Sequence, residues 1–443
     1  MMNNIWFDVS LVRSWGGHLG GVMRCEAQIA AELLQAHADK VIFCYWDDHN
    51  QLVQLSADGV RRQLECMAVL VPPKAQQPSA TATEQLQARI IELAQKLRQR
   101  LIRVMMFWVG QGVIQKLRDW SNWLTQLALQ SQPVAEPLLA IGAKDVYVSV
   151  GAGWVIDRFN YLYHLKRAVG FKTVLLCHDL IPVRFPDLSL EWIVRIFPYY
   201  LTNMAWCADV ILCNSKTTEN DLRDFLKYSG APEPQLQVVH YGSQIQEKFS
   251  EPITKRVSQI LRKKFILYVS TIELRKNHEI LCQAYLDLVS QGHRDLPLLV
   301  FVGSWGWGVQ GLQSSIQTHP ELSQWIVCLE GLQDAELAAL YRSCLFTVYP
   351  SYYEGWGLPV AESLAFGKYC LASQAPSLQE VGGDFIEYLD TRDARLWAQK
   401  ILWYFDHPEQ LKQKEHKIQQ QFIALPWSQT GDEIVQICQA QLK

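Results

Sequence analysis

Short apolar runs alternate with helical stretches along almost the whole chain, and this alternation constrains the fold more than any other feature. It is typical of parallel sheets that carry helices on both faces. Residues 244–262 interrupt the pattern, because they are polar and irregular. The sequence therefore predicts an α/β protein with two doubly wound domains that face a cleft. The apolar runs expected to form strands cover residues 5–9, 41–45, 145–150, 172–177, 208–215, 237–242, 265–270, 298–303, 327–332, 345–349 and 369–373.

The length of the chain also favours two domains, since 443 residues exceed what one hydrophobic core usually supports. We expect an N-terminal domain over residues 1–250 and a C-terminal domain over residues 260–426. Within the first domain, residues 72–82 are rich in Pro, Gln, Ser and Thr, which is typical of a linker. The pattern that follows predicts a helical insertion over about residues 80–135.

Residues 349–367 form the stretch that says most about chemistry. They join a short apolar run to a helix, because Pro359 suits a first helical position and Gly367 suits the position after the last. At such a turn the backbone N–H groups of Gly357 and Leu358 are unpaired and can face an anion. In parallel α/β sheets this place lies at the carboxyl edge, where ligands bind.

Two carboxylates flank this turn, with seven residues between them. Glu354 lies in the loop and is suited to contact a group attached beyond a phosphate. Glu362 lies one turn into the helix and can accept two hydrogen bonds from a diol such as a ribose. Taken singly, each is equally explained as an ordinary exposed carboxylate, with Glu362 favoured by the helix dipole.

Three further side chains follow predicted strands. Arg275 and Lys276 come after residues 265–270, where a guanidinium fork and a point charge can hold a diphosphate. Surface charge is the alternative explanation for both. His178 comes directly after residues 172–177 and is expected to point into the cleft, although a single His is more often structural.

Glycines at two places in the sequence are suited to bind parts of a nucleotide. Gly20 and Gly21 lie between the first predicted strand and a helix, where a turn without side chains lets the backbone approach a phosphate. The spacing is not that of the dinucleotide-binding GxGxxG pattern, and a plain loop explains it equally well. Gly331 lies in the run 327–332, at a strand end suited to the base.

The stretch around the two glutamates resembles the Glu-x7-Glu signature of retaining glycosyltransferases of family 4, which have the GT-B fold. The motifs YPS, GxGLPxxE and APSLQEVGGD all match those of the family. The segment HDLIPVRFP in the first half of the chain resembles a segment of the same family. The phosphate-binding phrase departs from the common form, because Ser270 and Thr271 stand in place of Gly and Arg, and Leu274 in place of Pro.

The resemblance implies a GT-B fold of two Rossmann-like domains, an N-terminal domain that binds the acceptor and a C-terminal domain that binds the nucleotide-sugar. It implies that residues 427–443 form a helix that crosses back to the first domain. It also implies a role for each matching residue: Glu354 and His178 contact the donor sugar, Arg275 and Lys276 bind phosphate, Glu362 binds ribose, and Gly20, Gly21 and Arg24 flank the diphosphate and the acceptor.

The implied reaction is transfer of a hexose, with mannose the first choice, to a glycan or lipid-linked saccharide in polysaccharide biosynthesis. The donor is expected to be GDP-mannose or another GDP-, UDP- or dTDP-linked hexose. No Asp-x-Asp triad stands out, so we expect metal-independent transfer without a cofactor. The alternatives are a nucleotide-sugar epimerase or phosphorylase of the same fold, or a non-catalytic nucleotide-sugar binder.

Composition and charge limit the partners and the cellular location that we expect for this chain. A net charge of -3 gives no basic field for nucleic acid. The eleven cysteines lack the CxxC spacing of a metal or redox site. No signal peptide is visible, and no apolar run reaches the roughly 20 residues of a membrane span. We therefore expect a cytoplasmic protein. A basic amphipathic pattern over residues 90–124 fits contact with the inner face of a membrane; packing on its own domain is the alternative.

Overall fold

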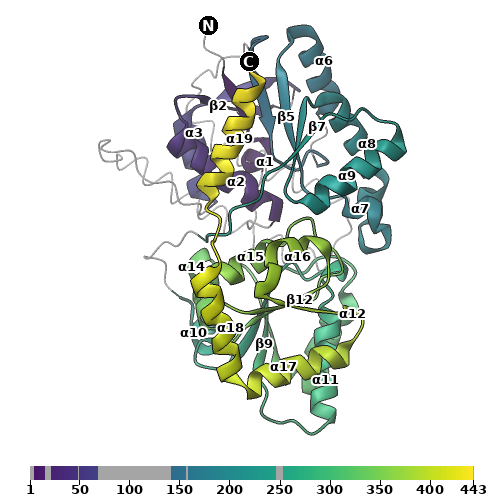
Figure 1. Cartoon of the computed structure of the whole chain (residues 1–443), viewed down its shortest axis with the longest axis vertical. Helices are drawn as coiled ribbons and strands as arrows, with labels where there is room; N and C mark the ends of the chain where they lie inside the picture. The colour runs from purple at the N-terminus through teal and green to yellow at the C-terminus, as the bar shows by residue number, and fades with distance from the viewer. Residues whose placement is uncertain are drawn as a thin grey trace, which may run out of the picture.

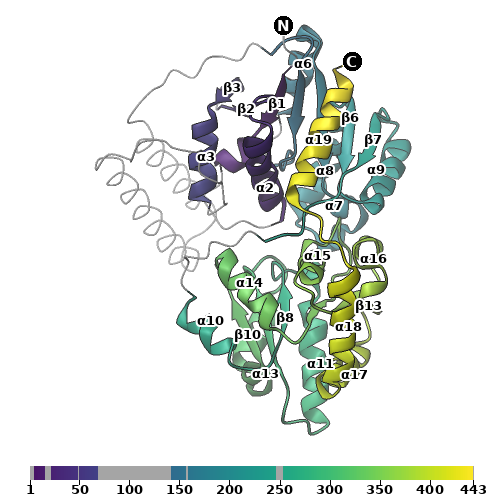
Figure 2. The same cartoon turned by 60° about the vertical axis from the view of Figure 1, so that its left-hand side comes forward.

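The computed structural model describes residues 4–14, 21–47, 49–67, 141–155, 158–245 and 253–442. These residues form two lobes stacked end to end, each with a sheet between layers of helices (Figures 1 and 2). The predicted insertion at about 80–135, with its expected membrane contact at 90–124, lies outside the described residues, as does Gly20. Among the residues described, no helix combines the length and the apolar character needed to cross a membrane.

The N-terminal sheet has the strand order β3-β2-β1-β4-β5-β6-β7 in the described part of the chain. All neighbours are parallel except β2 and β3. The strands are β1 (Ile5–Asp8), β2 (Val41–Trp46), β3 (Leu52–Leu55), β4 (Val146–Ser149), β5 (Lys172–Cys177), β6 (Val210–Cys213) and β7 (Gln235–Val238). The helices of this lobe are α1 (Ser10–Ser14), α2 (Gly21–Ala36), α3 (Ala57–Cys66), α6 (Phe159–Val169), α7 (Ile181–Arg184), η1 (Pro186–Leu188), α8 (Glu191–Cys207), α9 (Lys216–Ser229) and α19 (Trp427–Gln441).

The C-terminal sheet has the order β10-β9-β8-β11-β12-β13, and all its described neighbours are parallel. The strands are β8 (Phe265–Val269), β9 (Leu298–Val302), β10 (Ile326–Leu329), β11 (Thr347–Tyr349), β12 (Cys370–Ser373) and β13 (Glu387–Leu389). The helices are α10 (Lys255–Ile260), η2 (Leu274–Lys276), α11 (His278–Ser290), α12 (Gln310–Thr318), α13 (Pro320–Trp325), α14 (Asp334–Ser343), α15 (Leu358–Ala365), α16 (Pro376–Gly382), η3 (Gly383–Phe385), α17 (Ala394–Asp406) and α18 (Pro408–Gln421).

The central strands are apolar on both faces, which is why they read as continuous apolar runs rather than as an alternating pattern. In β5, Val174 and Leu176 belong to one buried cluster, and Leu175 and Cys177 belong to the cluster on the opposite face. Helices therefore cover both sides of the sheet, and only the strand ends remain for polar chemistry. The ten cysteines whose side chains are described are free thiols.

The C-terminal part of the chain returns to the N-terminal lobe. After α18 in the lower lobe it returns to the upper lobe, where α19 packs against α2 (Figure 1). Trp427, at the start of α19, stacks on Tyr241 with ring centroids 6.1 Å apart. Ile434 and Val435 complete the same buried cluster as the strands of the N-terminal sheet.

Sheet order brings the ends of β5 and β11 to the junction of the lobes. In each sheet the order in which successive strands are added changes direction at one point. This point lies between β1 and β4 in the N-terminal sheet and between β8 and β11 in the C-terminal sheet. Ligands of doubly wound sheets bind outside the carboxyl ends of the strands at such a point. Helices α15 and α16 lie at this junction in both views (Figures 1 and 2).

Candidate active site

The loop after β11 inserts into the N-terminal lobe. The carbonyl oxygen of Gly355 accepts hydrogen bonds from Ser215 Oγ at 2.6 Å and from Thr218 Oγ1 at 3.2 Å, both at the start of α9. A Cβ atom on Gly355 would lie 2.2 Å from the carbonyl oxygen of His178 and 2.9 Å from Cβ of Asp179. Glycine is therefore the residue that fits this contact between the lobes.

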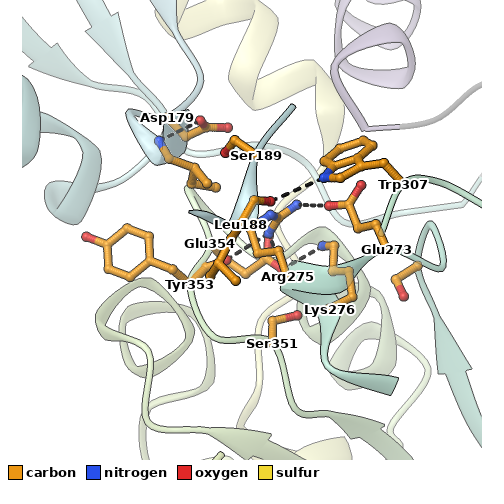
Figure 3. Close-up of polar contacts among 12 residues, drawn as sticks. Asp179, Leu188, Ser189, Glu273, Arg275, Lys276, Trp307, Ser351, Tyr353 and Glu354 are labelled. Atoms are coloured by element: carbon orange, nitrogen blue, oxygen red, sulfur yellow. Dashed lines mark hydrogen bonds and ion pairs between the residues drawn. The ribbon is translucent and has the colours of Figure 1, made fainter. Parts of the chain in front are cut away.

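The carboxylate of Glu354 lies between two cations (Figure 3). Its Oε1 is 2.8 Å from Nη1 of Arg275 and 2.6 Å from Nζ of Lys276. Lys276 also donates to Tyr349 Oη at 2.8 Å, and Ser377 Oγ donates to the backbone carbonyl of Glu354 at 2.7 Å. These contacts fix both the loop and its carboxylate.

The same contacts set the protonation of Glu354. Burial by itself would raise the pKa of this carboxyl, but Arg275 and Lys276 outweigh burial and lower the pKa to about 2. Burial lowers the pKa of Lys276, and Glu354 opposes that shift. Glu354 is therefore ionised near neutral pH, so it can accept hydrogen bonds but is a poor proton acceptor or donor.

A short turn presents the two cations. Residues 274–276 form η2 in the segment that follows the strand β8, and Asn277 ends the turn with a left-handed φ of 55°. Asn277 Nδ2 donates to the carbonyl oxygens of Pro350 at 3.3 Å and Thr391 at 3.0 Å. Tyr268 Oη donates to the carbonyl oxygen of Lys276 at 2.6 Å. Buried hydrogen bonds thus hold the cations next to the loop that carries Glu354.

The second carboxylate, Glu362, faces the N-terminal lobe. Its Oε2 accepts a hydrogen bond from Tyr341 Oη at 2.9 Å, and its Oε1 is 3.8 Å from Nη1 of Arg24. Arg24 lies near the start of α2 and forms an ion pair of 2.7 Å with Asp334 Oδ1. Burial raises the pKa of Glu362, and Arg24 opposes that rise. Arg24 therefore connects the two lobes at Glu362.

His178 uses both ring nitrogens within its own lobe. Nε2 lies 2.9 Å from the carbonyl oxygen of Val150, which can only accept, so the proton is on Nε2. Nδ1 then accepts from Tyr241 Oη at 2.6 Å. Burial lowers the pKa of His178 to about 4, although its hydrogen bonds to the carbonyls of Val150 and Gly151 oppose the shift. The side chain is neutral and holds the end of β5 in position.

This environment makes stability depend on pH through His178. An unfolded His has a pKa near its ordinary value of 6.5, so the unfolded state binds the proton first as pH falls. We expect unfolding free energy to decrease between pH 6.5 and 4 by roughly 3 kcal/mol from this group, and to be unaffected by it above pH 6.5. Denaturant unfolding at pH 7 and 4.5 should show a larger loss for the wild type than for His178→Asn; equal losses would contradict the assignment.

The predicted glycines Gly357 and Gly331 occupy backbone positions with left-handed φ. Gly357 precedes α15 with a φ of 113°, and a Cβ there would lie 2.4 Å from Leu378 Cδ2. The backbone N–H groups of Val360 and Ala361 donate to the carbonyl oxygen of Gly357. The N–H of Leu358 comes before these first hydrogen bonds of the helix in the chain. Gly331 has a φ of 69° after β10.

The structure thus groups the predicted residues in two sets. Glu354, Arg275 and Lys276 form one ion-paired cluster. Glu362 and Arg24 form the second, which lies farther along α15. Gly21 opens α2, three residues before Arg24. His178 reaches this region through its backbone, at Gly355.

Three acidic residues of this region were not predicted. Glu273 contacts Arg275, Asp334 contacts Arg24, and Asp179 lies beside Gly355. Asp334 has the sequence signal of a helix start, and Asp179 directly follows the predicted His178. In the residues described above, no group of three or more His, Cys, Asp or Glu side chains is arranged to hold a metal ion.

Comparison with known proteins gives consistent matches. Residues 250–421 match the family described as Glycosyl transferases group 1. The chain is 34% identical over 278 residues to the O-antigen chain mannosyltransferase B of Escherichia coli, covering 60% of this chain and 71% of that protein. It is 29% identical over 251 residues to the serotype-specific mannosyltransferase WbdA of E. coli, covering 54% of this chain but 28% of that relative's length.

Two solved structures align over nearly the full chain. Alr3699/HepE of Anabaena, in complex with UDP-glucose, has a TM-score of 0.60 at 15% identity and covers 99% of both chains. Sucrose-phosphate synthase of Thermosynechococcus elongatus has a TM-score of 0.60 at 16% identity and also covers 99% of both. At these identities the likeness concerns the fold, and the predicted GT-B fold of two Rossmann-like domains is confirmed.

Proposed function

Because the chain belongs to the group 1 glycosyl transferases, we propose that it is a retaining mannosyltransferase of family 4 that extends a surface polysaccharide. The observation that carries this proposal is the cluster of Glu354, Arg275 and Lys276 beside the N-terminus of α15. The two E. coli relatives, an O-antigen chain mannosyltransferase and a serotype-specific mannosyltransferase, support mannose as the sugar and a glycan as the acceptor.

The donor would lie along the C-terminal lobe. The ribose diol would bind Oε1 of Glu362, since Oε2 already accepts from Tyr341. The diphosphate would contact Arg275, Lys276 and the N–H groups at the start of α15, where the helix dipole favours an anion. Gly331, at the end of β10, would border the base. We assign residues 260–426 to the donor and residues 1–250 to the acceptor, with Gly20, Gly21 and Arg24 beside both the diphosphate and the acceptor.

The reaction breaks the bond between the anomeric carbon and the diphosphate oxygen and forms a bond from that carbon to the acceptor oxygen. The cations and the helix N-terminus stabilise the charge that develops on the leaving diphosphate. Glu354, ionised with a pKa of about 2, would orient sugar hydroxyl groups. It is too weak a base to take the acceptor proton, so we assign that proton to the departing phosphate oxygen. Donor and acceptor then react on one face, which retains the configuration.

A thermal-shift panel of GDP-mannose and other GDP-, UDP- and dTDP-linked hexoses tests the proposal. A donor at 100 times its Kd should add roughly 2.7 kcal/mol of stability. Transfer assays with a glycan acceptor then separate the alternatives. An epimerase converts the donor without an acceptor, a phosphorylase requires free phosphate, and a non-catalytic binder is stabilised without turnover.

Replacing Glu362 with Gln is expected to raise the Kd for the donor about tenfold to a hundredfold, because a charge-assisted hydrogen bond to the ribose is lost. Asp334 keeps Arg24 paired in this variant, so the interlobe contact remains. Calorimetric titration with GDP-mannose measures the change. Glu409→Gln, at an exposed position of α18, makes the same chemical change away from the site and serves as the control. Unchanged affinity in Glu362→Gln would contradict the ribose assignment.

A further inference from the structure

The two cations assigned to the diphosphate already have carboxylate partners. Arg275 Nη1 donates to the carbonyl oxygen of Tyr353 at 2.7 Å and lies 2.8 Å from Glu354 Oε1. Its Nη2 donates to Glu273 Oε1 at 2.7 Å. Lys276 contacts the same oxygen of Glu354. Two carboxylates therefore balance two cations, and the four side chains offer an incoming anion no net positive charge.

The third carboxylate makes the balance less favourable for an anion. Asp179, which faces the same group of residues from the N-terminal lobe, lies within electrostatic range of Arg275 and Glu354 (Figure 3). A diphosphate that binds Arg275 therefore competes with the carboxylates already paired with that guanidinium, and one of these carboxylates can give way. The two candidates are Glu354 and Glu273.

The geometry distinguishes these candidates. Glu354 is held by two cations at 2.6 and 2.8 Å, whereas Glu273 forms an ion pair with one cation, Arg275, among the described residues. Burial raises the pKa of Glu273 even though Arg275 opposes the rise, while the pKa of Glu354 falls to about 2. The negative charge of Glu273 is thus the less stabilised of the two, and Glu273 is the partner that gives way.

The backbone of Glu273 is held firmly while this occurs. Its neighbours Ile272 and Leu274 donate to the carbonyl oxygens of Ser304 at 2.9 Å and Trp307 at 3.2 Å. The residue is 3% exposed and lies between Arg275 and Trp307 (Figure 3). Because the backbone is fixed, the carboxylate can pair with Arg275 again when the anion leaves.

We propose that Glu273 is a positioning residue that pairs with Arg275 in the empty site and competes with the diphosphate for that guanidinium. The inference rests on the proposed function and deepens it. The competition weakens binding of the nucleoside diphosphate product and speeds its release after transfer. An enzyme that bound its product more tightly would have fewer free sites for the next donor.

The test is Glu273→Gln, which removes the charge but keeps an oxygen that accepts from Arg275. We expect the Kd of GDP or UDP to fall roughly tenfold, and their dissociation rate to fall in parallel. Titration calorimetry and stopped-flow displacement measure the two quantities, and inorganic pyrophosphate is a probe that does not depend on the base. Glu279→Gln, at an exposed position of α11, is the matched control. It should leave the nucleotide Kd, the dissociation rate and the affinity for pyrophosphate unchanged.

A merely structural role of Glu273 predicts the opposite change in nucleotide affinity. If Glu273 only orients Arg275, Glu273→Gln and Glu273→Ala will weaken nucleotide binding, and either that result or unchanged affinity overturns the proposal. A double-mutant cycle with Arg275→Lys adds a second readout, because the gain from Glu273→Gln should shrink when the guanidinium is absent. A wild type that binds neither nucleotide nor pyrophosphate would overturn this proposal and the proposed function together. Wild-type binding without the predicted gain would overturn only this one.

Discussion

Replacing Glu354 with Gln is expected to lower kcat at least about a hundredfold, while the affinity for the nucleotide stays the same or increases. The carboxylate is 2.6 Å from Lys276 and 2.8 Å from Arg275, so its charge fixes the position of both cations. Gln keeps the shape but loses the charge that we propose orients sugar hydroxyl groups. Steady-state kinetics with GDP-mannose and a glycan acceptor, together with nucleotide titration, measure the two effects.

The same variant is expected to be less stable. Two buried cations would lose their shared partner, and breaking a buried ion pair typically costs about 3–5 kcal/mol. The sign follows from the pKa of about 2. The contribution of Glu354 is complete above its ordinary pKa of 4.5 and is lost as pH falls toward 2. Glu409→Gln is again the control. A Glu354→Gln protein with the wild-type rate would show that this carboxylate takes no part in the reaction.

Replacing Gly355 with Ala is expected to reduce the transfer rate at least about a hundredfold by forcing the lobes apart, since a displacement of roughly 1 Å can have that effect. The added methyl group would lie 2.2 Å from the carbonyl oxygen of His178. Because the methyl group is fixed directly to the main chain and the carbonyl oxygen is part of it, neither can rotate away as the end of a flexible side chain does. Each lobe has its own core, so both should stay folded while the distance between them increases.

Small-angle scattering and kinetics measure the two parts of this prediction. Gly311→Ala, in α12, is the matched control, because a Cβ at Gly311 meets nothing within 4 Å and Ala is favourable in a helix. It should leave the scattering profile and the rate unchanged. A Gly355→Ala enzyme with normal scattering and normal rate would show that the loops adapt, and that the contact at His178 does not set the geometry of the cleft.

The sheets could largely be predicted from the sequence because their central strands are apolar on both faces. Residues 172–177 and 265–270 stand out for this reason. The two edge strands β3 and β13 were missed, since three- and four-residue segments such as Leu52–Leu55 are too short and too mixed to stand out. Gly382 and Gly383 favour a turn near Glu380, but residues 376–382 form the helix α16.

The ion-paired cluster could be predicted because β8 and β11 are neighbours in the sheet, so the residues after each strand meet at one edge. The contact of Arg24 with Asp334 could not be predicted, because the two residues lie on different lobes. Local patterns carry no information on how two domains are placed. His178 was predicted from its position after β5, and its contact with the donor sugar stays a prediction, since both ring nitrogens have protein partners.

The position of α19 has a consequence for how the protein is made. This helix covers α2 and completes the N-terminal core with Ile434, Val435 and Cys438, yet it is translated after the whole C-terminal domain. During synthesis, the first half of the chain leaves the ribosome with an apolar surface uncovered. The second half, which contributes its own strands and helices in one continuous segment, can reach its final state first. Until α19 emerges, the nascent N-terminal lobe therefore exposes an apolar surface that favours aggregation.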